Sequence, residues 1–314
     1  MTTTPRRAIT HSTRRLVAML VVLVAAVAAI GCGTDADDHP QVVVTTNILG
    51  DVVTELVGDQ ATVTTLMKPN ADPHSFGISA REANTMRTAG LIVYNGLGLE
   101  EGIEQHVSAA ADDGVPTVEA AAAARPLAYT TGDAAGAQDP HFWTDPTRMK
   151  DAAQAISRAL AEVDGIDTDR LRQATDDYLA ELTRLDQEMT DQFATIPADR
   201  RKLVTDHHVF GYLADRYDFE VVGAIIPSGT TLASPSSSDL ASLVGAINES
   251  SVPAIFVDTS QPDRLAQALA KETGSDIEIV ALYSESLDRP GTEADTYLNM
   301  MRTNASRISG ALTS

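Results

Sequence analysis

Cysteine and positive charge are both scarce in this sequence. Cys32 is the one cysteine among 314 residues, which excludes a disulfide framework and leaves packed cores as the source of stability. Lysine and arginine number 23 against 44 aspartates and glutamates. Such an acidic balance argues against nucleic acid and anionic membrane surfaces as partners. The His-Glu-x-x-His and Gly-x-Ser-x-Gly motifs of common hydrolases are also missing.

Long apolar runs are missing as well. The stretch from Leu16 to Ile30 has 15 residues, whereas a spanning helix needs about 20. Four arginines precede it, and Gly31-Cys32 follows it, which is the organisation of an export signal ending at a lipobox. We therefore expect residues 1–32 to be a signal peptide, with a lipid anchor on Cys32 at the extracytoplasmic face of the cell membrane. A plain secretory signal, giving a secreted or periplasmic product, is the alternative.

The part of the chain after the signal is large and strongly acidic. The signal contains four arginines and no acidic residue, so 19 basic and 44 acidic residues remain, a net charge of −25. This charge raises the local concentration of cations without identifying a binding site. About 280 residues exceed one typical domain and are consistent with two lobes.

β-Branched runs alternate with segments of helical spacing in both halves of the chain. We expect strands at 42–46, 62–67 and 91–94 in the first half, and at 203–205, 220–226, 254–258 and 277–282 in the second. This alternation predicts an α/β protein with two parallel sheets, each flanked by helices.

The middle of the chain breaks this alternation with helices alone. Asp145-Pro146 is typical of a helix start, and that helix is expected to reach Gly165. An apolar stripe then predicts a second helix over 167–197, ended by Pro197: Leu171, Ala174, Tyr178, Leu182, Leu185, Met189, Phe193 and Ile196. At 1.5 Å per residue it would be roughly 45 Å long, enough to join two lobes. The predicted division is a lobe at 33–166, a linking helix at 167–197 and a lobe at 198–314.

The tripeptide Asp-Pro-His occurs twice, at 72–74 and at 139–141, although the chain has only seven histidines. Proline restricts its own backbone and that of the residue before it, so each copy presents an imidazole on a stiff loop. Imidazole nitrogen is the commonest transition-metal ligand, and a carboxylate such as Asp72 or Asp139 is the usual group that orients it. The repeat therefore predicts metal ligands at His74 and His141.

Two further candidates follow strands of the second half. His207 comes directly after the strand expected at 203–205, and Glu285 follows the last strand, while His74 follows a strand of the first half. Ligands of open α/β sheets bind at the carboxyl ends of strands. These residues can converge only in a metal cleft between the two lobes.

The sequence resembles the metal-binding solute-binding proteins of bacterial zinc and manganese ABC importers, the helix-linked class. The similarity covers nearly all of the chain after the signal and rests on these segments in this order: Val44 to Asn47, Asp72-Pro73-His74, Tyr94-Asn95-Gly96, Leu99-Glu100, Asp139 to Trp143, His207 to Tyr212, Ile255-Phe256-Val257 and Asp295-Thr296-Tyr297. It implies four metal ligands, His74, His141, His207 and Glu285, where the family more often has aspartate at the last place. It further implies a monomer that delivers its metal to a membrane permease driven by a cytoplasmic ATPase, with no enzymatic activity.

The ligand set indicates which metal is carried. Three imidazoles and one carboxylate are suited to four-coordinate Zn²⁺, whereas Mn²⁺ prefers more oxygen ligands. Within the resemblance, manganese-type members tend to have an acidic residue where this chain has His207, which also favours zinc. The His-rich loop of many zinc members is absent, because the stretch from Tyr129 to Gln138 contains no histidine. We expect Zn²⁺, with Mn²⁺ as the alternative.

Two alternatives remain open, and one segment has no assigned role. A zinc-dependent hydrolase could use a similar ligand set, although four protein ligands leave no position for a catalytic water. His208 could replace His207 as the ligand if the register is displaced by one residue. The Ser/Thr/Pro-rich segment from Ser228 to Ser238 is expected to be a flexible loop near the cleft, with no role that the sequence reveals.

Overall fold

Two parallel four-stranded sheets form the framework of the protein. The computed structural model describes residues 1–3, 39–130, 134–274 and 276–313, and Pro40–Ser314 constitutes one structural unit. The strand orders are β2-β1-β3-β4 and β6-β5-β7-β8, with every pairing parallel. In each sheet the first strand in sequence lies between the second and the third, so the two lobes repeat one topology. The predicted α/β fold with two lobes is confirmed.

The strands are short and lie close to their expected positions. They are β1 (Gln41–Val44), β2 (Thr62–Thr65), β3 (Leu91–Tyr94), β4 (Thr117–Glu119), β5 (Lys202–Thr205), β6 (Glu220–Ala224), β7 (Ala254–Asp258) and β8 (Glu278–Leu282). The central strands β1 and β7 are almost wholly buried, which explains why their sequences read as continuous apolar runs.

Helices cover the sheets and connect the strands. They are α2 (Asn47–Val57), α3 (Ala80–Arg87), α4 (Glu104–Asp112), α5 (Ala120–Ala123), α6 (Pro146–Leu160), α7 (Thr168–Phe193), α8 (Gly211–Tyr217), α9 (Ser237–Ser250), α10 (Arg264–Thr273) and α11 (Tyr297–Thr313), with short 3₁₀ turns η1 (Phe142–Thr144) and η2 (Ala198–Arg200). Several begin at the capping residues that the sequence contains. Asp145 caps α6 ahead of Pro146, and Ser79 and Ser236 form capping boxes at α3 and α9.

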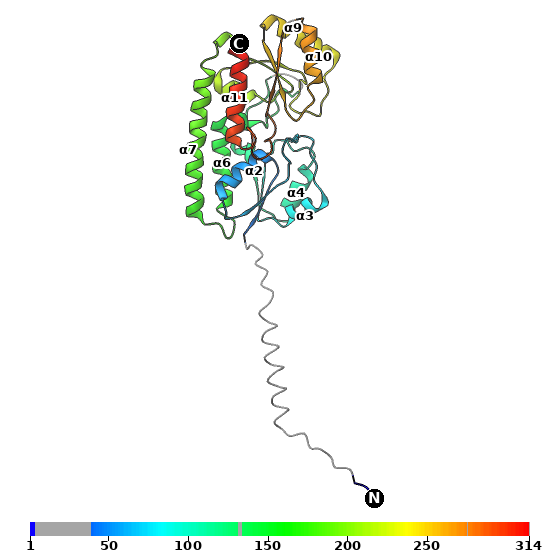
Figure 1. Ribbon diagram of the computed structural model, residues 1–314, viewed down its shortest axis with the longest axis vertical. Coiled ribbons are helices and arrows are strands. Elements are labelled where there is room, and N and C mark those ends of the chain that lie inside the picture. The colour runs from blue at the N-terminus through cyan, green and yellow to red at the C-terminus, as the bar shows by residue number, and fades with distance from the viewer. Residues whose placement is uncertain (4–38, 131–133, 275, 314) are drawn as a thin grey trace. The chain divides into compact units, whose positions relative to one another are not determined.

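Helix α7 is the long linking helix. It has 26 residues, which correspond to about 39 Å, and it lies beside α6 and α11 (Figure 1). It also packs on α2 of the first lobe, while Phe193 near its end stacks edge-on against Tyr217 and Phe219 of the second lobe, with ring centroids 5.1 and 5.0 Å apart. Its buried stripe differs from the expected one because Thr175 is buried instead of Ala174. The helix also ends at Phe193, before the expected Pro197, so that Ile196 is buried beyond its end.

Several of the described elements were not predicted from the sequence. Strand β4 is only three residues long, helix α5 and the 3₁₀ turns η1 and η2 have three or four residues each, and helix α11 follows a loop in which apolar residues are sparse. Helix α11 nevertheless packs on both α7 and α2, so it contributes to the contact between the lobes. Helix α6 also ends at Leu160, earlier than the expected Gly165.

The two lobes share one hydrophobic core. A continuous cluster of buried side chains includes Val42 and Phe142 of the first lobe, Leu182 of α7, and Tyr212 and Phe256 of the second lobe. Smaller clusters lie elsewhere in each lobe. A shared core resists separation of the lobes, because opening it would expose apolar surface to water.

The predicted signal peptide and Cys32 fall almost entirely outside the described residues, of which only residues 1–3 belong to that segment. Among the residues that the structure does describe, no helix combines the length and apolar character needed to cross a membrane.

Candidate metal centre

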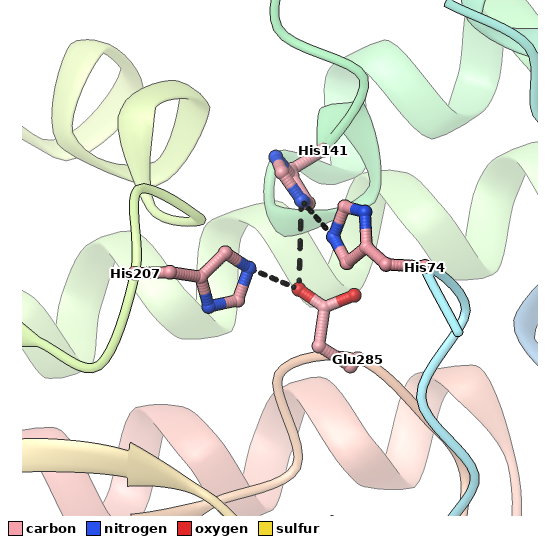
Figure 2. A group of neighbouring side chains, drawn as sticks. All are labelled: His74, His141, His207 and Glu285. Carbon is pink, nitrogen blue, oxygen red and sulfur yellow. Dashed lines mark hydrogen bonds and ion pairs between the residues drawn. The ribbon is translucent and has the colours of Figure 1, made fainter. Parts of the chain in front are cut away.

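Four side chains that the sequence singled out lie together between the lobes. His74, His141, His207 and Glu285 each direct one donor atom to a common point, and these atoms all lie within 4.8 Å of one another (Figure 2). The residues come from four loops: β2–α3, α5–η1, β5–α8 and β8–α11. Three of these loops follow the carboxyl ends of strands, where ligands of parallel sheets bind.

The cluster is fully enclosed, and several of its polar atoms lack a hydrogen-bond partner. The four residues are at most 1% exposed. The Nε2 atoms of His74 and His141 are 3.3 Å apart, and Oε1 of Glu285 lies 3.0 Å from Nε2 of His207 and 3.6 Å from Nε2 of His141. Neither carboxylate oxygen of Glu285, nor Nε2 of His207, makes a hydrogen bond of acceptable geometry. Buried polar atoms are normally satisfied, so this group fits a cation among the donors.

Burial and neighbouring charge divide the four groups into two pairs. Desolvation, helped by neighbouring imidazoles, lowers the pKa of His74 to about 2 and that of His141 well below its usual value, so both rings are neutral and available as ligands. Burial would also lower the pKa of His207, but the carboxylates of Asp206 and Glu285 raise it well above its usual value. Burial raises the pKa of Glu285 to about 8. A cation that binds here therefore competes with protons for the His207–Glu285 pair.

The second Asp-Pro-His copy has the expected orienting carboxylate. Oδ1 of Asp139 accepts a hydrogen bond from the backbone N–H of His141 at 2.9 Å and lies 2.8 Å from Nδ1 of its ring. The Tyr129 hydroxyl lies 3.1 Å from the same nitrogen, and Tyr212 donates to the backbone carbonyl of Asp139 at 2.7 Å. With Nδ1 engaged on this side, Nε2 of His141 faces the other donors.

The first copy has the same backbone turn but a different function, which corrects the expectation for Asp72. Oδ1 of Asp72 accepts the backbone N–H of His74 at 2.9 Å, yet Nδ1 of the His74 ring has no hydrogen-bond partner. The other oxygen, Oδ2, accepts hydrogen bonds from Thr231 at 2.6 Å and Gln261 at 3.0 Å. Asp72 therefore joins the first lobe to the second instead of orienting the imidazole.

The segment that carries Glu285 is held by both lobes. From the first lobe, the indole of Trp143 donates to the carbonyl of Ser284 at 2.8 Å, and Asn47 both donates to Ser286 and accepts from the backbone of Leu287. From the second lobe, the carboxylate of Asp258 accepts hydrogen bonds from the backbone N–H groups of residues 284 and 285.

His207, and not His208, belongs to the cluster. His208 is partly exposed and lines a separate cavity of about 330 Å³ with Tyr129 and Asp139. Its ring centroid lies 6.2 Å from that of Tyr129. The Ser228–Ser238 segment, for which no role was expected, contacts the first lobe through Thr231 and also through Thr230, which donates to Glu101 at 2.7 Å.

The residues that support the cluster were not predicted from the sequence. Asp258 ends strand β7, and a carboxylate at the end of a parallel strand is a signal that could have been used. Asn47 and Trp143 stand within segments that carry the family resemblance, but nothing in the sequence places them against residues 284–287, which are more than 130 positions away.

The chain is similar over most of its length to known metal-binding proteins. The family model for the zinc-uptake complex component A, periplasmic, matches residues 42–311. The manganese-binding lipoprotein MntA of Bacillus subtilis is 30% identical over 311 residues, covering 94% of this chain and 98% of that protein. The iron-binding protein YfeA of Yersinia pestis is 28% identical and covers 93% of this chain and 94% of its own length.

One relative is similar in both sequence and structure. The zinc-binding protein TroA of Treponema pallidum is 30% identical over 281 residues, covering 88% of this chain and 90% of that protein. Its solved structure matches this one with a TM-score of 0.81 at 28% identity and covers 87% of this chain and 99% of its own. The chain thus belongs to the family of the periplasmic zinc-uptake component A and is a metal-binding, substrate-binding protein of an ABC importer.

Proposed function

We propose that the protein captures one Zn²⁺ ion outside the cytoplasm and delivers it to a membrane permease driven by a cytoplasmic ATPase. His74, His141, His207 and Glu285 are the proposed ligands. The observation that carries the proposal is their convergence: four buried donor groups within 4.8 Å, with unsatisfied atoms on Glu285 and His207. Burying such groups without a partner costs free energy that a bound cation would offset.

The donor set supports zinc over manganese. Three imidazole nitrogens and one carboxylate match the tetrahedral preference of Zn²⁺, whereas Mn²⁺ is usually bound by more oxygen atoms. Manganese is the second candidate, because relatives such as MntA are named for manganese. A hydrolytic function receives less support, since four protein donors would fill the shell that a catalytic water needs.

Affinity alone cannot distinguish zinc from manganese. Most N/O sites bind Zn²⁺ more tightly than Mn²⁺, whatever metal the protein transports. The informative experiment compares the cellular zinc and manganese content of cells with and without this protein during limitation for each metal. We expect only the zinc content to fall in cells that lack this protein. A selective fall in manganese content would show that the protein serves manganese import instead.

We propose that Cys32 carries a lipid anchor that holds a monomer at the extracytoplasmic face of the membrane, with a secreted or periplasmic form as the alternative. Relatives such as MntA are named as lipoproteins, which supports the anchor. We also propose the division into lobes at 33–166 and 198–314 with the linking helix at 167–197. Mass spectrometry of the mature protein tests the anchor, because a diacylated Cys32 adds a defined mass.

A further inference from the structure

We propose that Asp258 is a positioning residue of the metal centre, which fixes the direction of the Glu285 carboxylate without binding the cation. The inference rests on the proposed function, since it assumes that Glu285 is a ligand. It concerns a buried side chain that lies outside the four-donor cluster.

The Asp258 carboxylate is placed by the sheet. Strands β7 and β8 pair in parallel, with Asp258 opposite Leu282, so the end of β7 lies beside the start of the loop that carries Glu285. Asp258 is 1% exposed. A carboxylate at this depth is costly unless its oxygens are hydrogen-bonded.

Both oxygens of Asp258 are fully engaged. Oδ2 accepts hydrogen bonds from the backbone N–H groups of Ser284 and Glu285, each at 3.0 Å, and from the Ser284 hydroxyl at 2.7 Å. Oδ1 accepts the backbone N–H of Ser260 at 2.7 Å and also the Ser260 hydroxyl. Five donors leave no lone pair for a cation, so Asp258 cannot serve as a fifth ligand.

These contacts fix the peptide that carries Glu285. With the N–H groups of residues 284 and 285 both directed at Asp258 and the carbonyl of Ser284 bonded to Trp143, the 284–285 peptide has one orientation. The Glu285 side chain then leaves the backbone toward the three imidazoles (Figure 2). Removing Asp258 frees this peptide on the second-lobe side, whereas the contacts of Asn47 with residues 286 and 287 remain.

The test compares Asp258→Ala and Asp258→Asn with the wild-type protein. Metal-free protein is titrated with Zn²⁺ in competition with a chelator, and the visible absorption of the Co²⁺ form reports the coordination geometry. We expect Asp258→Ala to weaken Zn²⁺ binding by about 10- to 100-fold, the usual range for groups that orient ligands, and to alter the Co²⁺ spectrum. In Asp258→Asn an amide N–H₂ replaces one acceptor oxygen. The Zn²⁺ affinity of this variant should therefore lie between that of the wild-type protein and that of Asp258→Ala.

A matched control separates positioning from fold stability. The carboxylate of Asp167 also accepts two backbone N–H groups, at the start of α7, and none of its partners belongs to the metal centre. Asp167→Ala should lower the melting temperature while leaving the Zn²⁺ affinity and the Co²⁺ spectrum unchanged.

The outcomes are distinguishable. Wild-type affinity and spectrum in both Asp258 variants would overturn the positioning role and leave the proposed function intact. If Asp258→Ala fails to fold, Asp258→Asn decides by the same two measurements. If the wild-type protein binds neither Zn²⁺ nor Co²⁺, the proposed function itself is wrong.

Discussion

Oδ1 of Asp139 lies 2.8 Å from Nδ1 of His141, whereas Asp72 of the other Asp-Pro-His copy makes no hydrogen bond with Nδ1 of His74. In both copies the carboxylate accepts the backbone N–H of the histidine at 2.9 Å. Both copies of the repeat therefore adopt the same backbone contact, but only the second copy orients the ring of its histidine.

This difference gives a matched pair of substitutions. Asp139→Ala and Asp72→Ala remove the same backbone contact, but only Asp139→Ala removes the contact with the imidazole. We expect Asp139→Ala to weaken Zn²⁺ binding by about 10- to 100-fold and Asp72→Ala to weaken it clearly less. Competition titration with a chelator measures both values. Equal losses would show that the ring contact contributes nothing.

Asp72 should instead affect the rate of metal release. Thr231→Val removes a hydrogen bond that crosses between the lobes to the Asp72 carboxylate. Hydrogen bonds to charged groups contribute up to about 1.5–3 kcal/mol, less where water reaches them, so Zn²⁺ transfer to excess chelator should accelerate by about fivefold. Stopped-flow mixing provides the measurement. Thr190→Val is the control, because its hydroxyl bonds within α7, and an equal acceleration there would argue against a link between the lobes.

Glycine at position 211 leaves room for the Asp139 carboxylate. A Cβ atom there would lie 2.7 Å from Oδ2 of Asp139, too close for either group to remain in place. Gly211→Ala should therefore displace Asp139 and weaken Zn²⁺ binding by about tenfold. Gly245→Ala, within α9 and with no atom near its Cβ, should stabilise the protein by up to about 1 kcal/mol and leave binding unchanged. Undiminished affinity in Gly211→Ala would refute the steric argument.

Asp51 makes stability depend on pH away from the metal centre. Burial raises its pKa to about 6, although it accepts a hydrogen bond from the backbone N–H of Tyr297. Since the folded-state pKa exceeds the unfolded value of about 3.9, its stabilising contribution is complete below pH 4 and is lost as pH rises through 6. Asp51→Asn should thus stabilise the protein by about 1–2 kcal/mol at pH 7.5.

Denaturant unfolding at pH 7.5 and at pH 4.5 measures that contribution. The gain from Asp51→Asn should shrink at pH 4.5, where the wild-type carboxyl is already protonated. A gain of equal size at both pH values would contradict the ionisation argument and would indicate that packing alone distinguishes the two side chains.

Much of the fold could be predicted because its signals are local. The apolar strands, the cap at Asp145 and the stripe along α7 each depend on neighbouring residues. Helix α11 and strand β4 could not be predicted, since one is stabilised by long-range packing on α7 and the other has only three residues. Local sequence could not exclude His208 as the ligand in place of its neighbour His207. Only the folded loop directs the ring of His207 into the cluster and that of His208 into a cavity.

Three of the four clustered side chains were predictable for a related reason. His74, His207 and Glu285 follow strands, and parallel strands bring their carboxyl ends to one edge of a sheet. His141 follows no strand, and the repeated Asp-Pro-His tripeptide predicted it instead. Their supporting contacts were not predictable, because Asn47 reaches residues 240 positions away and Asp72 reaches Gln261 across the lobe boundary. Such contacts are set by the packing of the lobes and leave no periodic trace in the sequence.

The claim that His74, His141, His207 and Glu285 bind one cation is tested most directly by native mass spectrometry. Protein stripped with a chelator and then supplied with one equivalent of Zn²⁺ should retain one zinc per chain. The His74→Ala/His141→Ala double variant, shown to be folded by circular dichroism, should retain none. Retention of one tightly bound zinc by that variant would contradict the account.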